Sequence, residues 1–133
     1  MRLTFAFFAM CLMGFGWMMS CADNPYKQGA ILYENFCASC HMEDGVGLEG
    51  LIPPLAGADF LKNNNLQTAC IIRKGITDSL MVNGRLYTDP MAAIPQLSDF
   101  DINNIINYIN QAWGNDYGYV KLEDVRKTLE SCR

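Results

Sequence analysis

The single histidine of this chain, His41, follows directly on two cysteines in the run Cys37-Ala38-Ser39-Cys40-His41. A zinc site built on this run would need a second pair of ligands, but Cys70 and Cys132 each stand alone in the sequence and no other histidine exists among the 133 residues. A thioredoxin-like dithiol would need a preceding strand and a βαβ pattern, which the sequence does not show. A plain disulfide would leave the histidine without a role.

The spacing C-x-x-C-H is the attachment signature of a c-type haem. Its chemistry requires two thiols that add to the two vinyl groups on one edge of the porphyrin, followed by an imidazole that reaches the iron. We therefore predict one haem c, bound covalently through Cys37 and Cys40, with His41 as an iron ligand.

Length and composition fit one folded domain. Half of the residues are apolar and 18% are charged, so the chain can bury a core. The formal charge of −4 argues against a nucleic-acid binder, which would need a basic surface to meet phosphates.

The first twenty residues have the pattern of a secretory signal peptide, because Arg2 precedes an uncharged apolar stretch from Leu3 to Met19. Met18-Met19-Ser20-Cys21 is similar to the lipobox of bacterial lipoproteins, in which Cys21 becomes the lipidated N-terminus. Cleavage after Ala22 is one alternative. An uncleaved anchor is another, although the stretch is short for a span of about 20 residues. We expect a leader over 1–20 and one domain over 21–133, on the periplasmic side of the membrane, where disulfides can form.

The domain is predicted to be all-α, with unusually long loops that need something to pack against. No convincing strand is visible, and residues 42–58 and 75–97 have loop composition. We expect five helices. The first runs from Asn24-Pro25 towards Cys37, a short second one starts near Asp59, and a third runs from near Leu66 to before Gly75. The fourth covers 99–113, with Ser98 as its cap and an apolar stripe of Ile102, Ile105, Ile106 and Ile109, and the fifth covers about 121–132.

An ordered series of motifs resembles a bacterial monohaem class I cytochrome c over about residues 25–130. The matching segments are Gly29…Tyr33…Cys37-x-x-Cys40-His41, Pro53-Pro54-Leu55-Ala56-Gly57, Val82-Asn83-Gly84…Tyr87…Met91 and Leu97-Ser98-Asp99…Tyr108…Trp113-Gly114. The resemblance implies the class I cytochrome c fold, in which helices and long loops wrap around one covalently bound haem. It also implies that Gly29 lets Tyr108 approach where the first helix crosses a later one.

The iron needs a sixth ligand, and the lack of a second histidine excludes a bis-histidine site within one chain. Five of the eight methionines lie in the leader, and Met42 starts on the same side of the ring as His41. Met81 and Met91 remain. Met91 matches the axial methionine of the family, although Pro90 precedes it where the family has a proline after it. Met81 is expected to be a core or haem-packing residue.

The resemblance also implies a hydrogen bond from His41 to the carbonyl of Pro53, with Pro54 as the alternative acceptor. Arg73, Asn83 and Tyr87 are candidates for hydrogen bonds to the haem propionates, and a solvated surface role is equally open to each.

Cys70 and Cys132 remain after the leader cysteine Cys11, the lipidation candidate Cys21 and the haem-binding pair are set aside. An even pair in an oxidising compartment predicts a disulfide, which would tie down the penultimate residue. Two buried free thiols are the alternative.

His/Met ligation implies an electron carrier, not an enzyme, because it leaves no open position on the iron. The expected donors are a dehydrogenase or a quinol-oxidising complex, and the expected acceptors are an oxidase or a reductase. Two alternatives stay open: a haem c subunit of a larger redox enzyme, and a haem sensor or peroxidase in which Met91 is displaced. We expect contact with the membrane through the N-terminal lipid and none with nucleic acid.

Overall fold

The computed structural model describes residues 24–132 of the protein. The predicted leader, with Cys11, and the predicted lipidation site at Cys21 lie outside these residues. The described elements are α2 (Lys27–Phe36), α3 (Ala38–His41), α4 (Asp59–Asn63), α5 (Asn65–Lys74), β1 (Leu80–Val82), β2 (Arg85–Tyr87), α6 (Asp99–Ile109), the 3-10 turn η1 (Ala112–Gly114) and α7 (Leu122–Ser131). Within this part of the chain no helix has the length and apolar character that a membrane crossing requires.

Helix α6 is the centre of the domain and packs against α2, α5 and α7. Its N-terminus is a complete capping box, in which Ser98 accepts from the backbone of Asp101 and the Asp101 carboxylate accepts from the backbone of Ser98. The predicted isoleucine stripe is fully buried. The helix ends at Ile109, before the predicted 113, and the chain continues into η1, where Trp113 has a left-handed backbone (φ 55°).

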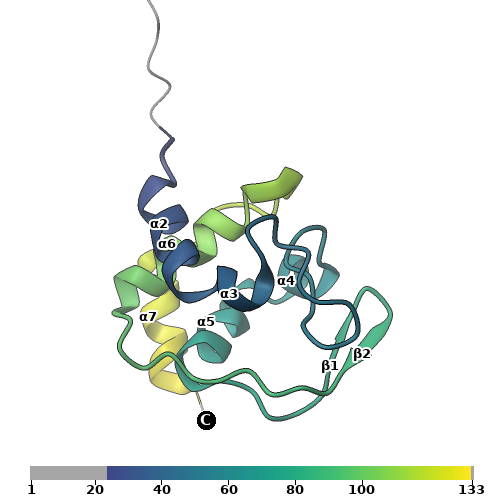
Figure 1. The fold of residues 1–133 in the computed structure, drawn as a ribbon. Coiled ribbons are helices and arrows are strands. Elements are labelled where there is room, and N and C mark those ends of the chain that lie inside the picture. Colours follow the sequence, from purple (N-terminus) through teal and green to yellow (C-terminus); the bar gives the residue numbers. More distant parts are fainter. Residues whose placement is uncertain (1–23, 133) are drawn as a thin grey trace, which may run out of the picture.

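Helix α2 crosses α6 on one side of the molecule (Figure 1). Gly29 lies at the crossing, where a Cβ atom would be 2.2 Å from the carbonyl oxygen of Asn104 and 2.6 Å from Cβ of Tyr108. The close approach is therefore to the backbone of α6 as well as to the tyrosine. The helix begins at Lys27 and not at Pro25, because the Asn24 side chain accepts from the amide of Tyr26 and caps a turn there.

The prediction of no strand was wrong. β1 and β2 form an antiparallel hairpin, with Leu80 opposite Tyr87, at the edge of the molecule away from α2 and α7 (Figure 1). Asn83 and Gly84 form its two-residue turn and both have positive φ (51° and 74°), which matches the backbone twist of paired strands. An Asn-Gly pair between two short segments rich in apolar residues is a strong hairpin signal, but the loop composition of residues 75–97 led to its being overlooked.

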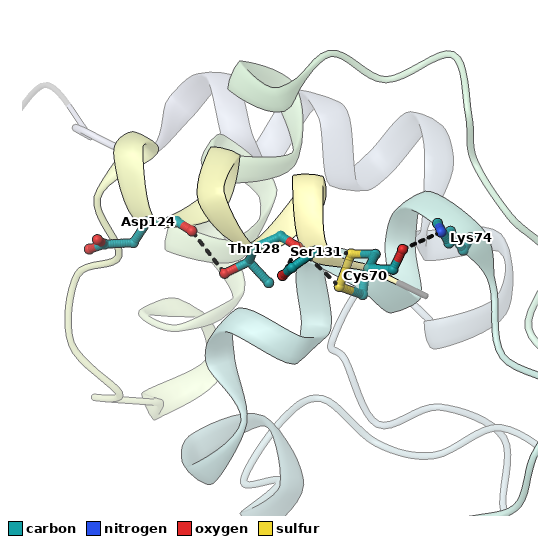
Figure 2. The surroundings of a disulfide bond; sticks show 6 residues. Cys70, Lys74, Asp124, Thr128 and Ser131 are labelled. Atoms are coloured by element: carbon teal, nitrogen blue, oxygen red, sulfur yellow. Dashed lines mark hydrogen bonds between the residues drawn. A yellow bond between two sulfur atoms is a disulfide. The ribbon is translucent and has the colours of Figure 1, made fainter.

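Helix α7 packs against α5, and a disulfide joins Cys70 on α5 to Cys132 at the end of α7 (Figure 2). The two Cα atoms are 5.6 Å apart. Lys74, at the C-terminal end of α5, also donates to the backbone carbonyl of Cys132. The last helix is thereby fixed to the helix that precedes the hairpin.

Candidate haem site

The C-x-x-C-H run folds into a single helical turn at the end of α2. The amide of Cys37 donates to the carbonyl of Tyr33 (2.8 Å), and the amide of His41 donates to the carbonyl of Cys37 (2.9 Å). Cys37 is buried and Cys40 is exposed. Burial, followed by the nearby Cys40, raises the pKa of the Cys37 thiol to about 12, so this thiol stays protonated at neutral pH.

These three side chains line one apolar cavity of about 1050 Å³, a volume that includes the space at its mouth. Its walls come from helices far apart in the sequence, from the hairpin and from the loop after His41. Among the lining residues are Tyr33, Leu61, Thr68, Ile72, Val82, Ile105 and Ile109. Two thiols and an imidazole on the wall of a large apolar cavity are the donor set and the surroundings that a c-type haem needs.

The His41 ring is buried, and its Nδ1 lies 3.0 Å from the carbonyl oxygen of Pro53. Because a carbonyl can only accept, this contact fixes the tautomer with the proton on Nδ1 and leaves the Nε2 lone pair for a metal. Burial lowers the pKa of His41, and the hydrogen bond to Pro53 offsets this only in part. Gly47 makes room for the contact, since a Cβ atom there would be 2.4 Å from the carbonyl oxygen of Ile52 and 2.6 Å from that of Pro53.

The two candidate methionines differ in position. Met91 lines the cavity together with Pro90. Met81 is on the hairpin, is about half exposed (53%) and does not line the cavity. Met42 follows α3, where its carbonyl accepts from the Tyr33 hydroxyl at 2.7 Å. The structure therefore places Met91, and not Met81, in the same cavity as His41.

Of the three propionate candidates, only Tyr87 lines the cavity. Arg73 donates to the carboxylate of Asp99 at 2.8 Å. The Asn83 side chain accepts from the amide of Asp59 at 3.0 Å and so stabilises the start of α4. Neither Arg73 nor Asn83 is brought to the cavity. Both side chains form hydrogen bonds to other residues of the protein that the sequence did not indicate.

Several cavity residues were missed by sequence reasoning. Thr68 and Ile72 lie four apart on α5 and face the cavity, a spacing that could have identified that helix as a wall. Asp78 and Asp89 also line the cavity, and the sequence carries no signal for them.

Comparison with known proteins identifies the family. Residues 26–113 match the model of the family Cytochrome c. The chain is 34% identical over 91 residues to cytochrome c-552 of Thermus thermophilus, covering 65% of this chain and 69% of that protein.

Two further relatives are cytochrome c subunits of quinone alcohol dehydrogenases. The subunit from Gluconobacter oxydans is 31% identical over 74% of this chain, and the one from Gluconacetobacter polyoxogenes is 29% identical over 86%. The aligned segment makes up only 21% and 25% of those subunits. The chain belongs to the cytochrome c family.

Proposed function

We propose that this protein transfers electrons through one haem c, attached through Cys37 and Cys40 and ligated by His41 and Met91. The observation that carries the proposal is that one apolar cavity is lined by all four of these residues. The family to which the chain belongs supports haem-based electron transfer in general terms.

The bound haem would supply one-electron exchange between Fe(III) and Fe(II). The chain itself contributes two thiols as covalent anchors and an imidazole whose orientation is fixed by Pro53. Met91, which lines the same cavity, would be the second protein ligand to the iron. With His41 and Met91 both bound, no position would remain for a substrate, and this would favour a carrier over an enzyme.

Electrons would enter and leave where the cavity reaches the surface. Cys40 and Leu51 both line the cavity and are both exposed. The expected partners are a dehydrogenase or a quinol-oxidising complex as donor, and an oxidase or a reductase as acceptor. The net negative charge favours a partner with a basic docking patch, because opposite charges steer short-lived encounters.

A permanent subunit role is the second candidate. It is supported by the relatives named as cytochrome c subunits of quinone alcohol dehydrogenases. Co-purification from native membranes, followed by size-exclusion chromatography, separates the two: a free carrier elutes at the size of the small chain, and a subunit elutes with its enzyme.

We also propose that residues 1–20 are removed, that 21–133 remain as the mature chain and that Cys21 anchors it to the membrane by lipid on the periplasmic side. The support is the lipobox-like run Met18-Met19-Ser20-Cys21. Mass spectrometry of the N-terminal peptide tests this: a diacylglycerol-modified Cys21 is expected, and a soluble protein that starts at Asp23 would contradict it.

The direct test of function is a haem stain and a visible spectrum of protein matured in a host that attaches haem c. Electron-transfer function predicts haem that survives denaturing electrophoresis, together with the weak red absorbance band of Met sulfur on Fe(III). Covalent haem without that band would favour the sensor or peroxidase alternative, in which the iron is open.

A further inference from the structure

Gly75 lies directly after α5, and its backbone conformation (φ 75°, ψ −177°) is one that only glycine adopts readily. A Cβ atom at this position would be 2.4 Å from the carbonyl oxygen of Met91 and 2.8 Å from the amide nitrogen of Ala93. Both neighbours are backbone atoms, which cannot rotate away as a flexible side chain could. The segment that carries Met91 therefore lies as close to α5 as a glycine permits.

Three hydrogen bonds hold this close approach. The amide of Ile76 donates to the carbonyl of Met91 (3.0 Å), and the amide of Met91 donates to the carbonyl of Ile76 (2.9 Å). The amide of Ile94 donates to the carbonyl of Ile72 (3.0 Å). Both backbone groups of Met91 are therefore fixed by one residue, the one that follows Gly75.

The two sides of this contact differ in how firmly they are held. Helix α5 is buried at Ile72 and is joined to α7 by the Cys70–Cys132 disulfide. The Met91 segment is a loop without helix or strand of its own beyond the bridge to Ile76. A side chain at position 75 would therefore displace the Met91 segment more readily than it would displace α5.

We propose that Gly75 is a positioning residue for the Met91 sulfur: its missing side chain lets the Met91 backbone bind to Ile76, and this sets how far Met91 reaches into the cavity. The inference rests on the proposed role of Met91 as sixth ligand. It assigns a function to a glycine that does not line the cavity. It also gives a way to hold the Met91 loop in a chain where a proline, Pro90, precedes the methionine instead of following it.

The test compares Gly75→Ala with Gly118→Ala in the holoprotein. Gly118 also has positive φ (81°), but nothing lies within 4 Å of a Cβ atom there, so this control carries backbone strain without the overlap. The measurements are the red absorbance band of Fe(III) and the affinity for added imidazole, which competes with Met91 for the iron. For Gly75→Ala we expect a weakened band and imidazole binding tighter by about tenfold or more, because apparent affinity rises with the fraction of iron that Met91 has left. Gly118→Ala should match the parent in both readouts.

A drop in thermal stability of Gly75→Ala with an unchanged band and imidazole affinity would overturn the inference. If Met91→Ala keeps the red absorbance band, the proposed ligation by Met91 fails. If Met91→Ala loses the band but Gly75→Ala keeps it, the ligation stands and the proposed role of Gly75 fails. If Gly75→Ala does not accumulate, Ile76→Pro replaces it, with Ile76→Ala as its control, because only the proline removes the amide that donates to the Met91 carbonyl. Tighter imidazole binding in Ile76→Pro than in Ile76→Ala supports the inference, and equal binding refutes it.

Discussion

The carbonyl oxygen of Pro53 lies 3.0 Å from Nδ1 of His41, twelve residues away along the chain. This contact orients the imidazole and increases its electron donation to a bound metal. It depends on a backbone carbonyl, so a substitution of Pro53 itself would leave the acceptor in place. Gly47 is the position from which the contact can be changed.

Gly47→Ala is expected to raise the reduction potential, since a Cβ atom would overlap the Ile52 and Pro53 carbonyls and push the acceptor away from His41. A weaker hydrogen bond makes His41 a poorer donor and favours Fe(II). A hydrogen bond worth about 1 kcal/mol corresponds to roughly 40 mV for one electron. Potentiometric titration measures this, with Gly57→Ala as control, because it has similar φ (64°) and no atom within 4 Å of the added Cβ. An equal shift in both variants would contradict the prediction.

Met91→Ala should leave the haem covalently attached, abolish the red absorbance band and lower the reduction potential, because the sulfur ligand is lost. Met81→Ala is the matched variant, since this side chain is half exposed on the hairpin. It should keep both the band and the potential. The reverse pattern would show that Met81 is the ligand.

Three features of the fold and of the site could be predicted well from the sequence, because their signals are local. The Ser98 cap, the isoleucine stripe of α6 and the Cys37–His41 turn each need only neighbouring residues. The partners of Arg73 and Asn83 are 26 and 24 residues away, and no local pattern indicates them. The hairpin had a local signal in Asn83-Gly84, and its three-residue strands were too short to show alternation.

Gly29→Ala is expected to destabilise the fold by about 1–3 kcal/mol, the usual cost of overpacking. The added Cβ would be 2.2 Å from the carbonyl oxygen of Asn104, and α2 would have to move away from α6. Alanine favours a helix over glycine by about 1 kcal/mol, so the overlap must exceed this gain for the sign to hold. Urea denaturation measures the difference, with the exposed Gln28→Ala as control on the same helix. A Gly29→Ala protein as stable as the parent would show that the crossing can relax.

The free energy of unfolding should fall at alkaline pH because of Tyr33. Burial is the largest cause that raises the pKa of its hydroxyl above the ordinary value of 10. The protonated hydroxyl donates to the carbonyl of Met42. Because the folded pKa is raised, the contribution is complete below about pH 10, the unfolded value, and is lost as the pH rises further.

Tyr33→Phe should therefore lose about 1 kcal/mol at neutral pH and show a shallower decline above pH 10. Urea titrations between pH 8 and 11 measure this, with the exposed Tyr119→Phe as control. Burial also raises the pKa of Tyr108 and of Tyr117, so part of the decline should remain. An alkaline decline as steep as in the parent would assign it to other groups.

The double variant Cys70→Ser/Cys132→Ser should lose stability while the haem site stays intact. The bridge joins residues 62 apart, and closing a loop of that size stabilises a fold by about 4 kcal/mol on the chain-entropy model. The disulfide joins side chains of α5 and α7, whereas the Met91 segment is held by backbone hydrogen bonds, from Ile94 to Ile72 and between Met91 and Ile76. We therefore expect a lower urea midpoint, with the red absorbance band and the reduction potential unchanged.

Thiol titration of the denatured, unreduced parent holoprotein should find neither Cys70 nor Cys132 alkylated, and two reactive thiols there would contradict the bridge. A loss of the band in the double variant would instead show that the disulfide helps to position Met91.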